Sequence, residues 1–207
     1  MLIDLHTHTK RYSDDSELTP EDLIEQARSS GLDGICFTEH NWHWTEEDIA
    51  KLSLEHKFPV FHGIEIGSDE GHLLVFGLPA YNFSMLYARS IKQLVDQVNG
   101  AIILAHPYRW QLHFYSNPDD LLEEALKNSI FNIVDAVELL NGRSSDEENK
   151  FVQKLCRKLN LRGVGGSDAH SSRDLPACAT RFERIINNTR ELITELKKGR
   201  FQAVDLR

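Results

Sequence analysis

The segment LIDLHTHT, residues 2–9, places two histidines one residue apart at the end of a short apolar run. In an extended strand, the side chains of residues i and i+2 project from the same face. His6 and His8 would therefore point to one place, close enough for both imidazoles to bind one metal ion. Histidine is the commonest metal ligand, although it is also an ordinary surface residue. The pair raises the hypothesis of a metal site.

Further histidines and carboxylates stand where other β-rich runs end. In barrels of parallel strands, the chemistry lies at the carboxyl ends of the strands and on the loops that follow. Six predicted strand ends carry such groups: His6 with His8, Glu39 with His40, Glu65, His106, Glu138, and Asp168 with His170. His72 opens the second strand of a predicted hairpin, which returns it to the same end as Glu65. Random placement would put most of these residues in helices, so the pattern predicts a site for several metal ions.

The types of side chain narrow the choice of metal. Imidazole with carboxylate suits zinc, manganese or iron, whereas calcium and magnesium favour sites made mostly of oxygen. A tetrahedral zinc ion needs about four ligands, so there are too many candidates for one ion. The candidates suit two or three ions bridged by a carboxylate, and they are His6, His8, Asp14, His40, Glu65, His72, His106, Asp168 and His170.

The elements that must position these residues are short strands that alternate with helical patterns, which is typical of βα units and a mostly parallel sheet. Strands are predicted at residues 2–6, 34–38, 58–66, 72–78, 101–106, 133–140 and 162–167. Helices are predicted at about 20–30, 45–56, 85–97, 119–127, 146–159 and 190–198, the last closing the chain. Thr19 and Thr45 are expected N-caps, and Gly31 ends the first helix. We find no internal repeat or linker, so we expect one barrel-like domain over residues 1–207.

The composition is that of an ordinary soluble globular chain. The 207 residues are 41% hydrophobic and 27% charged, and the net charge is -9. This charge argues against a broad surface for nucleic acid or anionic membranes, but it allows a small basic pocket. Three separated cysteines without a CxxC motif indicate a reducing compartment. The N-terminus has no signal-peptide pattern and no run approaches 18 apolar residues, so we expect a cytoplasmic protein without membrane contact.

Four histidines are not expected to bind metal. His43, His56 and His113 lie in helical or loop stretches without partner spacing, and we assign them to surface or core. His62 stands three residues before Glu65 in a strand and therefore points to the opposite face.

The sequence resembles the PHP (polymerase and histidinol phosphatase) family of metal-dependent phosphoesterases. The matching pieces are DLHTHT followed by YSDD, FTEH, GIEI, AHPY and GSDAH, which occur in the family's order over residues 4–170. Each piece alone is weak, but the ordered set is specific. The resemblance implies a distorted (β/α)7 TIM-like barrel of the α/β class, with a trinuclear metal centre at its carboxyl end.

The resemblance also implies a division of the ligands. His6, His8 and Asp168 with a bridging Glu65 look like the first metal site. His72 and His106 share Glu65 in the second site, and the third site is made of Asp14, His40 and His170. Many members have SDG where this chain has SDD, so Asp14 is the better match and Asp15 an alternative. TEH replaces the common TDH, and we expect Glu39 to orient neighbouring groups rather than to bind metal.

A phosphate substrate calls for nearby cations, because arginine binds phosphate through charge-assisted hydrogen bonds. Candidates follow the ligand-bearing strand ends, with solvated loop charge as the competing interpretation: Arg109, Arg143, Arg173, Lys10 and Arg11. Glu138 and Asn141 fall on the same rim and could orient water or substrate. An aromatic loop, YRWQLHFYSN, with Trp42 and Trp44 could stack on a base, or pack in the core.

The resemblance and the ligand set imply hydrolysis of a phosphoester, either a phosphomonoester or a nucleotide-type phosphodiester, by a metal-bound hydroxide at a di- or trinuclear centre. The expected partner is a small phosphorylated substrate or nucleotide. One alternative is an exonuclease that trims short nucleic-acid ends. An amidohydrolase-type enzyme also begins with HxH, but the chain is short and shows no metal-bridging lysine at a strand end. A non-catalytic metal-binding module would be expected to lack some ligands, and none of the nine positions is vacant.

Overall fold

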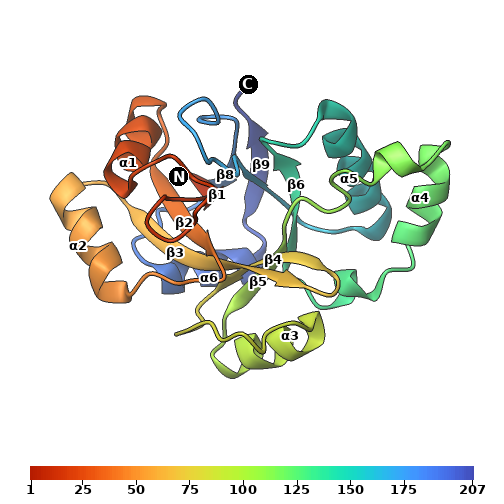
Figure 1. The fold of residues 1–207 in the computed structure, drawn as a ribbon, viewed down its shortest axis with the longest axis horizontal. Coiled ribbons are helices and arrows are strands. Elements are labelled where there is room, and N and C mark those ends of the chain that lie inside the picture. The colour runs from red at the N-terminus through yellow and green to blue at the C-terminus, as the bar shows by residue number, and fades with distance from the viewer.

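In the computed structural model, which describes residues 1–207, nine strands form one sheet and six α-helices pack around it (Figure 1). The strands are β1 (Leu2–Thr7), β2 (Gly34–His40), β3 (Val60–Ser68), β4 (Gly71–Phe76), β5 (Ala101–Leu104), β6 (Ala136–Asn141), β7 (Gly163–Gly166), β8 (Cys178–Phe182) and β9 (Phe201–Asp205). The helices are α1 (Pro20–Ser29), α2 (Glu46–His56), α3 (Ala88–Gln97), α4 (Pro118–Ala125), α5 (Asp146–Leu159) and α6 (Thr189–Lys198). Short 3-10 turns occupy Leu112–Phe114 and Ser129–Asn132.

The sheet has the order β7-β6-β5-β4-β3-β2-β1-β8-β9. Strands β1, β2 and β3 are parallel, as are β5, β6 and β7. Strand β4 lies between the two sets and is antiparallel to both of its neighbours. The predicted hairpin of β3 and β4 is therefore present, and it takes the place of one βα unit.

The two parallel sets meet at a seam between β7 and β1. The backbone N–H of Asp168 donates to the carbonyl of His6 over 2.7 Å, and that of His8 donates to Ala169 over 3.0 Å. This seam makes the sheet a nearly closed barrel, so the predicted fold class is confirmed.

Two strands at the C-terminal end were not predicted. Strand β8 pairs with the start of β1, and β9 follows α6 and pairs with β8, so α6 does not close the chain. The burial of β9 alternates only weakly between half-buried and exposed residues. Such a strand gives little hydrophobic periodicity by which to recognise it.

The helices begin where the capping residues predict. The side chains of Thr19 and Thr45 accept hydrogen bonds from the backbone of Asp22 and Asp48, which caps α1 and α2. Ser145 forms a capping box with Glu148 at the start of α5. Helix α3 is shorter than predicted, because it starts at Ala88 rather than at residue 85.

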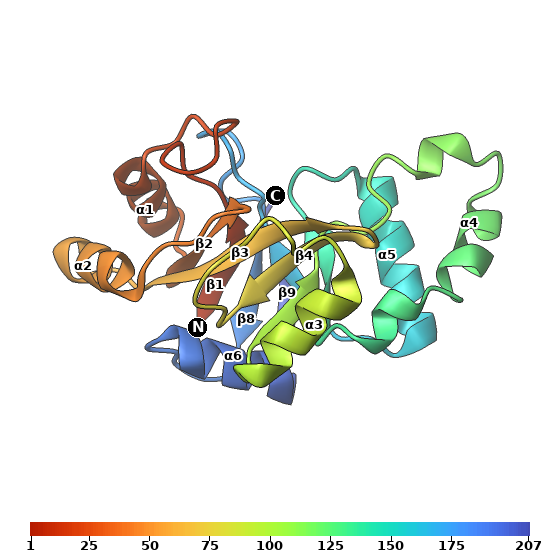
Figure 2. The same cartoon turned by 60° about the horizontal axis from the view of Figure 1, so that its bottom comes forward.

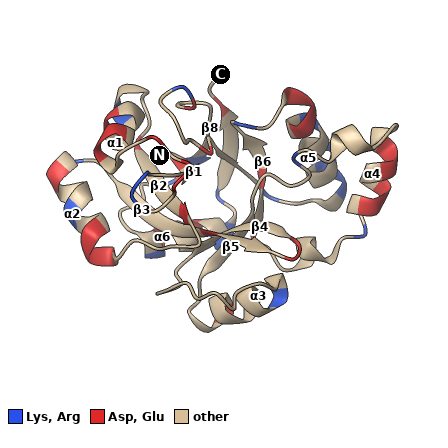
Figure 3. Cartoon of the chain, viewed as in Figure 1, with Lys and Arg blue, Asp and Glu red and all other residues tan.

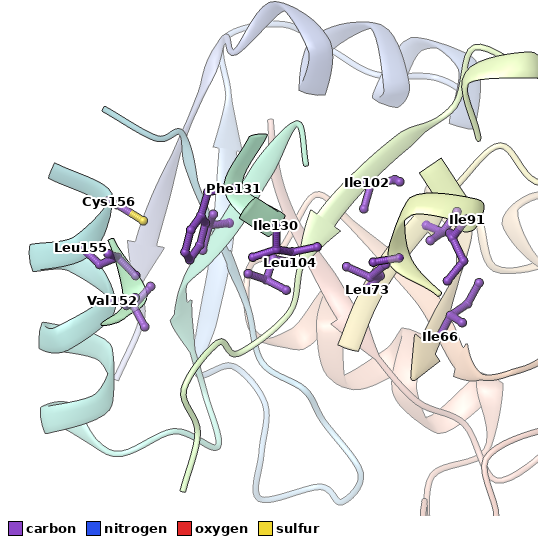
Figure 4. Close-up of a cluster of buried hydrophobic side chains, with 14 of the residues drawn as sticks. Ile66, Leu73, Ile91, Ile102, Leu104, Ile130, Phe131, Val152, Leu155 and Cys156 are labelled. Carbon is purple, nitrogen blue, oxygen red and sulfur yellow. The ribbon is translucent and has the colours of Figure 1, made fainter. Parts of the chain in front are cut away.

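The hydrophobic core is divided by the barrel wall. A cluster of 21 buried residues fills the space between the sheet and helices α3, α4 and α5 (Figure 4). A second cluster packs under α1 and α2, on the other side of the molecule (Figure 2). In the barrel interior, Leu192 and Leu196 of α6 pack with Ile3 and Ala101, which lie near the amino ends of β1 and β5. Helix α6 thus closes the barrel at the end opposite the strand-end histidines.

The surface carries mostly negative charge on the outer helices. Figure 3 shows acidic residues on α1, α2, α4 and α5, in keeping with the net charge of -9. All of the helices are too short or too polar to serve as transmembrane segments.

The packing of α5 gives a test of the core. Leu155 is completely buried in the 21-residue cluster, so Leu155→Ala should lower the free energy of unfolding by about 2–5 kcal/mol. Leu54 on α2 is 79% exposed, and Leu54→Ala should change it by less than about 0.5 kcal/mol. Urea unfolding followed by circular dichroism, with a chelator present to remove any contribution from metal binding, measures both. Equal effects of the two substitutions would contradict this description of the core.

Candidate metal centre

Eight of the nine predicted ligands lie together at the carboxyl end of the barrel. His6 and His8 come from the end of β1, His40 from β2, Glu65 from β3, His72 from β4, His106 from the loop after β5, and Asp168 and His170 from the segment after β7. Four overlapping groups of donor atoms within this set are close enough to hold a metal ion. The hairpin brings His72 beside Glu65, as its predicted position requires.

The first group consists of His6, His8, Glu65 and Asp168, and its nitrogen–oxygen distances are close to those in a tetrahedral site. The Nε2 atom of His6 lies 3.4 Å from Oε2 of Glu65 and 3.5 Å from Oδ1 of Asp168. The corresponding distances from Nε2 of His8 are 3.3 and 3.4 Å. Ligands about 2.0–2.1 Å from a tetrahedral zinc ion lie roughly 3.3–3.4 Å from one another. The Nε2 atoms of His6 and His8 therefore lie at ligand spacing from an oxygen of each carboxylate.

Three of these four atoms are buried and make no hydrogen bond of regular geometry: Nε2 of His6, Nε2 of His8 and Oε2 of Glu65, the last of which lies 2.9 Å from Nδ1 of His40. Buried polar atoms are almost always paired, because an unpaired one costs about 1–3 kcal/mol. Their convergence without partners shows that the residues present fit a bound cation.

Glu65 also joins the first group to a second. Its other oxygen, Oε1, lies 2.8 Å from Nδ1 of His72 and 3.0 Å from Nε2 of His106. The carboxylate thus faces two sets of imidazoles, which is the arrangement expected of a bridging ligand.

A third group contains His40 and His170, whose Nε2 atoms are 3.4 Å apart. Asp15 completes it, since its Oδ2 atom lies 3.3 Å from His40 and 3.1 Å from His170. Asp14, the preferred prediction, is exposed and has no hydrogen bond or ion pair to the group. The structure therefore places the alternative, Asp15, at the site. The loop after β1 is held by hydrogen bonds to its own backbone and to β2, and sequence spacing alone could not show which aspartate it turns inward.

Glu138 orients the imidazole of His6 from the side opposite the metal position. Its Nδ1 atom is 3.0 Å from Oε1 of Glu138, which leaves Nε2 to face the metal position. The second oxygen of Glu138 accepts from the backbone N–H of His106 over 2.7 Å and from the side chain of Asn141 over 3.0 Å. Glu138 and Asn141 lie on the rim, as predicted, and contact the ligands rather than the solvent.

An irregularity in the sheet re-aims the end of β1. Asp4 pairs with Ile35 and Thr7 with Phe37, so a step of three residues on β1 faces a step of two on β2. Such an extra residue turns the following side chains. Leu5 packs in the barrel interior, and His6 beside it enters the metal site.

A similar irregularity lies across the seam in β6, between Glu138 and Leu140. The neighbouring strand β7 passes very close to His6 and Glu138 at Gly166. A Cβ atom on Gly166 would lie 2.6 Å from Cβ of His6 and 2.7 Å from Oε1 of Glu138. Glycine at this position therefore allows His6 and Glu138 to pack against β7.

The carboxylates and imidazoles of the site shift one another's pKa values. Burial alone would lower the pKa of His6, yet the carboxylates of Asp168, Glu138 and Glu65 raise it well above its ordinary value. Burial would likewise lower the pKa of His8, and Asp168 and Glu65 raise it to about 8. Burial opposes ionisation of Glu65, but the surrounding imidazoles hold its pKa well below the usual range. Metal binding must displace the protons on these imidazoles.

Of the five predicted phosphate-binding cations, two lie at the site. Arg109 and Arg143 line a hollow of about 520 Å³ together with the metal-site residues. Arg109 is already engaged: its guanidinium donates to Asp168 and, over 2.7 Å, to Oδ1 of Asn141. Arg143 is exposed, and its side chain makes no ion pair or hydrogen bond within the chain.

The other three predicted cations lie elsewhere. Lys10 and Arg173 are exposed loop residues without ion pairs and do not line this hollow. The guanidinium of Arg11 lies over the ring of Trp44, 5.1 Å from its centroid, and does not line this hollow. For these three, phosphate contact stays a prediction, because they do not line the metal-centre hollow.

The residues of the predicted aromatic wall are divided between core and surface: Trp44 and Tyr108 pack inside, whereas Trp42, Trp110 and Phe114 are exposed. Trp44 is buried and donates from Nε1 to Glu39 over 2.8 Å, and the ring of Tyr108 packs against Phe151. Trp110 remains at the site: it is 67% exposed and lines both the metal-centre hollow and a neighbouring one of about 580 Å³.

His62 was correctly assigned to the opposite face. It lines hollows between α2 and α6, on the outside of the barrel.

Sequence reasoning missed Ser13, which lies behind His8 within YSDD. A buried serine has no distinctive spacing by which to recognise it.

Comparison with known proteins places the chain in a family. The family profile described as PHP domain matches residues 4–155, and the one described as PHP-associated matches residues 146–201. The chain therefore belongs to the PHP domain family. The boundary between the two matches falls in α5, and the single sheet draws strands from both.

The chain is similar to three further proteins. The uncharacterized protein MJ1587 of Methanocaldococcus jannaschii is 27% identical over 175 residues, which cover 76% of this chain and 95% of that protein. A two-domain protein of Bacteroides vulgatus that contains a predicted PHP-like metal-dependent phosphoesterase has a TM-score of 0.69 at 16% identity, covering 99% of this chain and 64% of the other. An amidohydrolase from Chromobacterium violaceum, solved with bound sulfate and no metal, has a TM-score of 0.67 at 14% identity and covers 99% and 98%. At these identities the two solved structures show the shared fold.

The first site predicts the effect of removing a ligand. His6→Ala should lower the metal content by at least one ion per chain, because it removes one donor atom of four. His113→Ala, an exposed histidine away from the site, should retain the wild-type content. Elemental analysis of both proteins after dialysis against zinc measures the difference. Full metal content in His6→Ala would show that the imidazole is not a ligand.

The raised pKa values predict proton release. At about pH 7, His6 and His8 are protonated in the metal-free protein, since their pKa values lie above this pH. Zinc uptake by chelator-treated protein should therefore release protons, and the release should shrink as the pH rises past the pKa of His8. Calorimetric titration in two buffers of different ionisation enthalpy detects it. A binding enthalpy independent of buffer would contradict the assignment.

Proposed function

We propose that this protein is a metal-dependent phosphoesterase that hydrolyses a small phosphorylated substrate. The observation that carries the proposal is the convergence of unpaired, buried donor atoms from His6, His8 and Glu65 beside Asp168. Membership of the PHP domain family, with structural relatives that include PHP-like phosphoesterases, supports the same conclusion. We treat residues 1–207 as one domain in this proposal, since the sheet is continuous.

The proposed centre holds two or three divalent ions of zinc, manganese or iron. Three groups of residues would hold them: His6, His8, Glu65 and Asp168; Glu65, His72 and His106; and Asp15, His40 and His170. Bound ions of this kind supply an activated water molecule and neutralise the charge on a phosphoryl group. The mixture of imidazole and carboxylate favours these metals over calcium or magnesium.

The protein's own residues would bind and orient the phosphate. Arg143 has a free guanidinium in the same hollow as the donors, so we assign it to the phosphate oxygens. Arg109 fixes Oδ2 of Asp168, which leaves Oδ1 to face His6 and His8. Arg109 therefore orients a ligand as well as lining the phosphate position.

The group esterified to the phosphate has room beside the centre. The hollow of about 580 Å³ shares His72, His106, Arg109 and Trp110 with the metal-centre hollow. This volume suits a small organic alcohol or a nucleoside, so both monoesters and nucleotide-type diesters are candidate substrates.

The alternatives receive less support. An exonuclease needs a basic track for the backbone, whereas only two arginines line the centre and the net charge is -9. An amidohydrolase with a bridging lysine is not favoured, because no lysine lines the metal-centre hollow.

The direct test combines metal analysis with assays on one preparation. We expect two or more ions per chain, together with hydrolysis of p-nitrophenyl phosphate or its diester that is lost on chelation and restored by metal. Protein that binds no metal after reconstitution would refute the proposal. Protein that binds metal but hydrolyses amides and no phosphoester would favour the amidohydrolase alternative.

The role of Arg143 gives a separate prediction. Arg143→Ala should lower kcat/KM about tenfold or more, because a charge-assisted hydrogen bond contributes about 1.5–3 kcal/mol. Its metal content should not change, since no donor atom contacts it. Arg173→Ala, which removes an exposed loop arginine, is the matched control and should behave as wild type. Unchanged kinetics in Arg143→Ala would mean that this arginine is only a surface charge.

A further inference from the structure

The hydroxyl of Ser13 lies behind the metal centre, in the loop between β1 and α1. The residue is 1% exposed. Its Oγ atom is 3.3 Å from Nδ1 of His8, 3.2 Å from the backbone nitrogen of His40 and 2.7 Å from Oε2 of Glu39. One hydroxyl group therefore contacts two residues of β2 and the ring of a metal-site histidine.

The directions of these hydrogen bonds follow from their chemistry. A hydroxyl has one proton to donate and two lone pairs to accept with. A carboxylate can only accept, so the proton of Ser13 goes to Glu39. The two lone pairs then accept from the N–H of His40 and from Nδ1–H of His8. This keeps a proton of His8 on Nδ1, so that Nε2, which lies beside Glu65 and Asp168, is the nitrogen that would bind a metal ion.

Glu39 is in turn fixed by four donors. Its Oε2 accepts from the backbone N–H of Thr9 over 3.0 Å as well as from Ser13. Its Oε1 accepts from the hydroxyl of Thr9 over 2.6 Å and from Nε1 of Trp44 over 2.8 Å. An amide at this position would turn its NH2 group towards an N–H donor in either orientation. The site therefore requires an acceptor at both atoms.

The same loop carries Asp15 and is also attached to His8 and to His170 of the third group. The hydroxyl of Ser16 donates to the carbonyl of His8 over 2.8 Å, and the backbone of Glu17 donates to that of His170 over 2.8 Å. Ser13 connects this loop to His40. Losing the Ser13 hydroxyl would loosen Asp15 and His40 together.

We propose that Ser13 and Glu39 form a hydroxyl–carboxylate pair that sets the tautomer of His8 and positions the third metal site. The proposal rests on the proposed function, in that it requires a metal centre built from these ligands. Both are positioning residues, since neither contacts the place where metal or substrate would lie.

The test measures metal rather than turnover. Wild type, Ser13→Ala, Ser13→Thr and Glu39→Gln are dialysed against zinc at fixed free concentrations and their bound metal is measured. The visible spectra of the cobalt-loaded proteins are then compared. Ser53→Ala is the matched control, because Ser53 also bridges two elements by hydrogen bonds, to the backbone of Val60, but lies far from the centre.

We expect Ser13→Ala and Glu39→Gln to hold about one ion fewer than wild type, with an affinity loss of roughly 10- to 100-fold and an altered cobalt spectrum. Ser13→Thr keeps the hydroxyl and should restore metal content, and Ser53→Ala should match wild type. Full occupancy and an unchanged spectrum in Ser13→Ala and Glu39→Gln would overturn the inference while leaving the proposed function intact. A wild-type protein that binds no metal would instead refute the proposed function. If Ser13→Ala does not fold, Glu39→Gln decides, and a full metal complement in it overturns the inference.

Discussion

The carboxylate of Glu65 is the group on which the rest of the site depends. It is almost completely buried, and its two oxygens face imidazoles on every side, including Nδ1 of His40 at 2.9 Å. Removing such a group from water is costly unless positive charge compensates it. The barrel supplies this compensation by directing strand ends toward one point. The histidines at the strand ends therefore surround the buried carboxylate of Glu65.

The departures from a regular barrel all serve this convergence. The β3–β4 hairpin replaces a βα unit and brings His72 back beside Glu65, which a crossover helix would have carried away. The register irregularities in β1 and β6 turn His6 and Glu138 toward each other across the seam. Gly166 leaves them the room to meet.

Much of the fold and of the donor set could be predicted from the sequence, because strand-end histidines and capping residues act through local spacing. His6 and His8 are recognised by the two-residue period of a strand, and Thr19 and Thr45 mark helix starts by their own side chains. What could not be predicted depended on contacts distant in sequence. The choice of Asp15 over Asp14 depends on how one loop is tied to β2, and the orientation of Arg109 depends on Asp168, 59 residues away. Strand β9 is held by pairing with β8 rather than by its own apolar pattern.

The guanidinium of Arg109 couples the binding of a cation at Asp168 to the binding of an anion in the neighbouring hollow. It holds Asp168, a predicted metal ligand, and it also lines the hollow where an anion would enter. An anion that engages Arg109 changes how tightly Asp168 is held, and a cation beside Asp168 changes what Arg109 can offer the anion. Thermodynamic linkage makes this coupling reciprocal. In the proposed centre, phosphate affinity and metal affinity would therefore depend on each other, and each would have to be measured at a stated concentration of the other ligand.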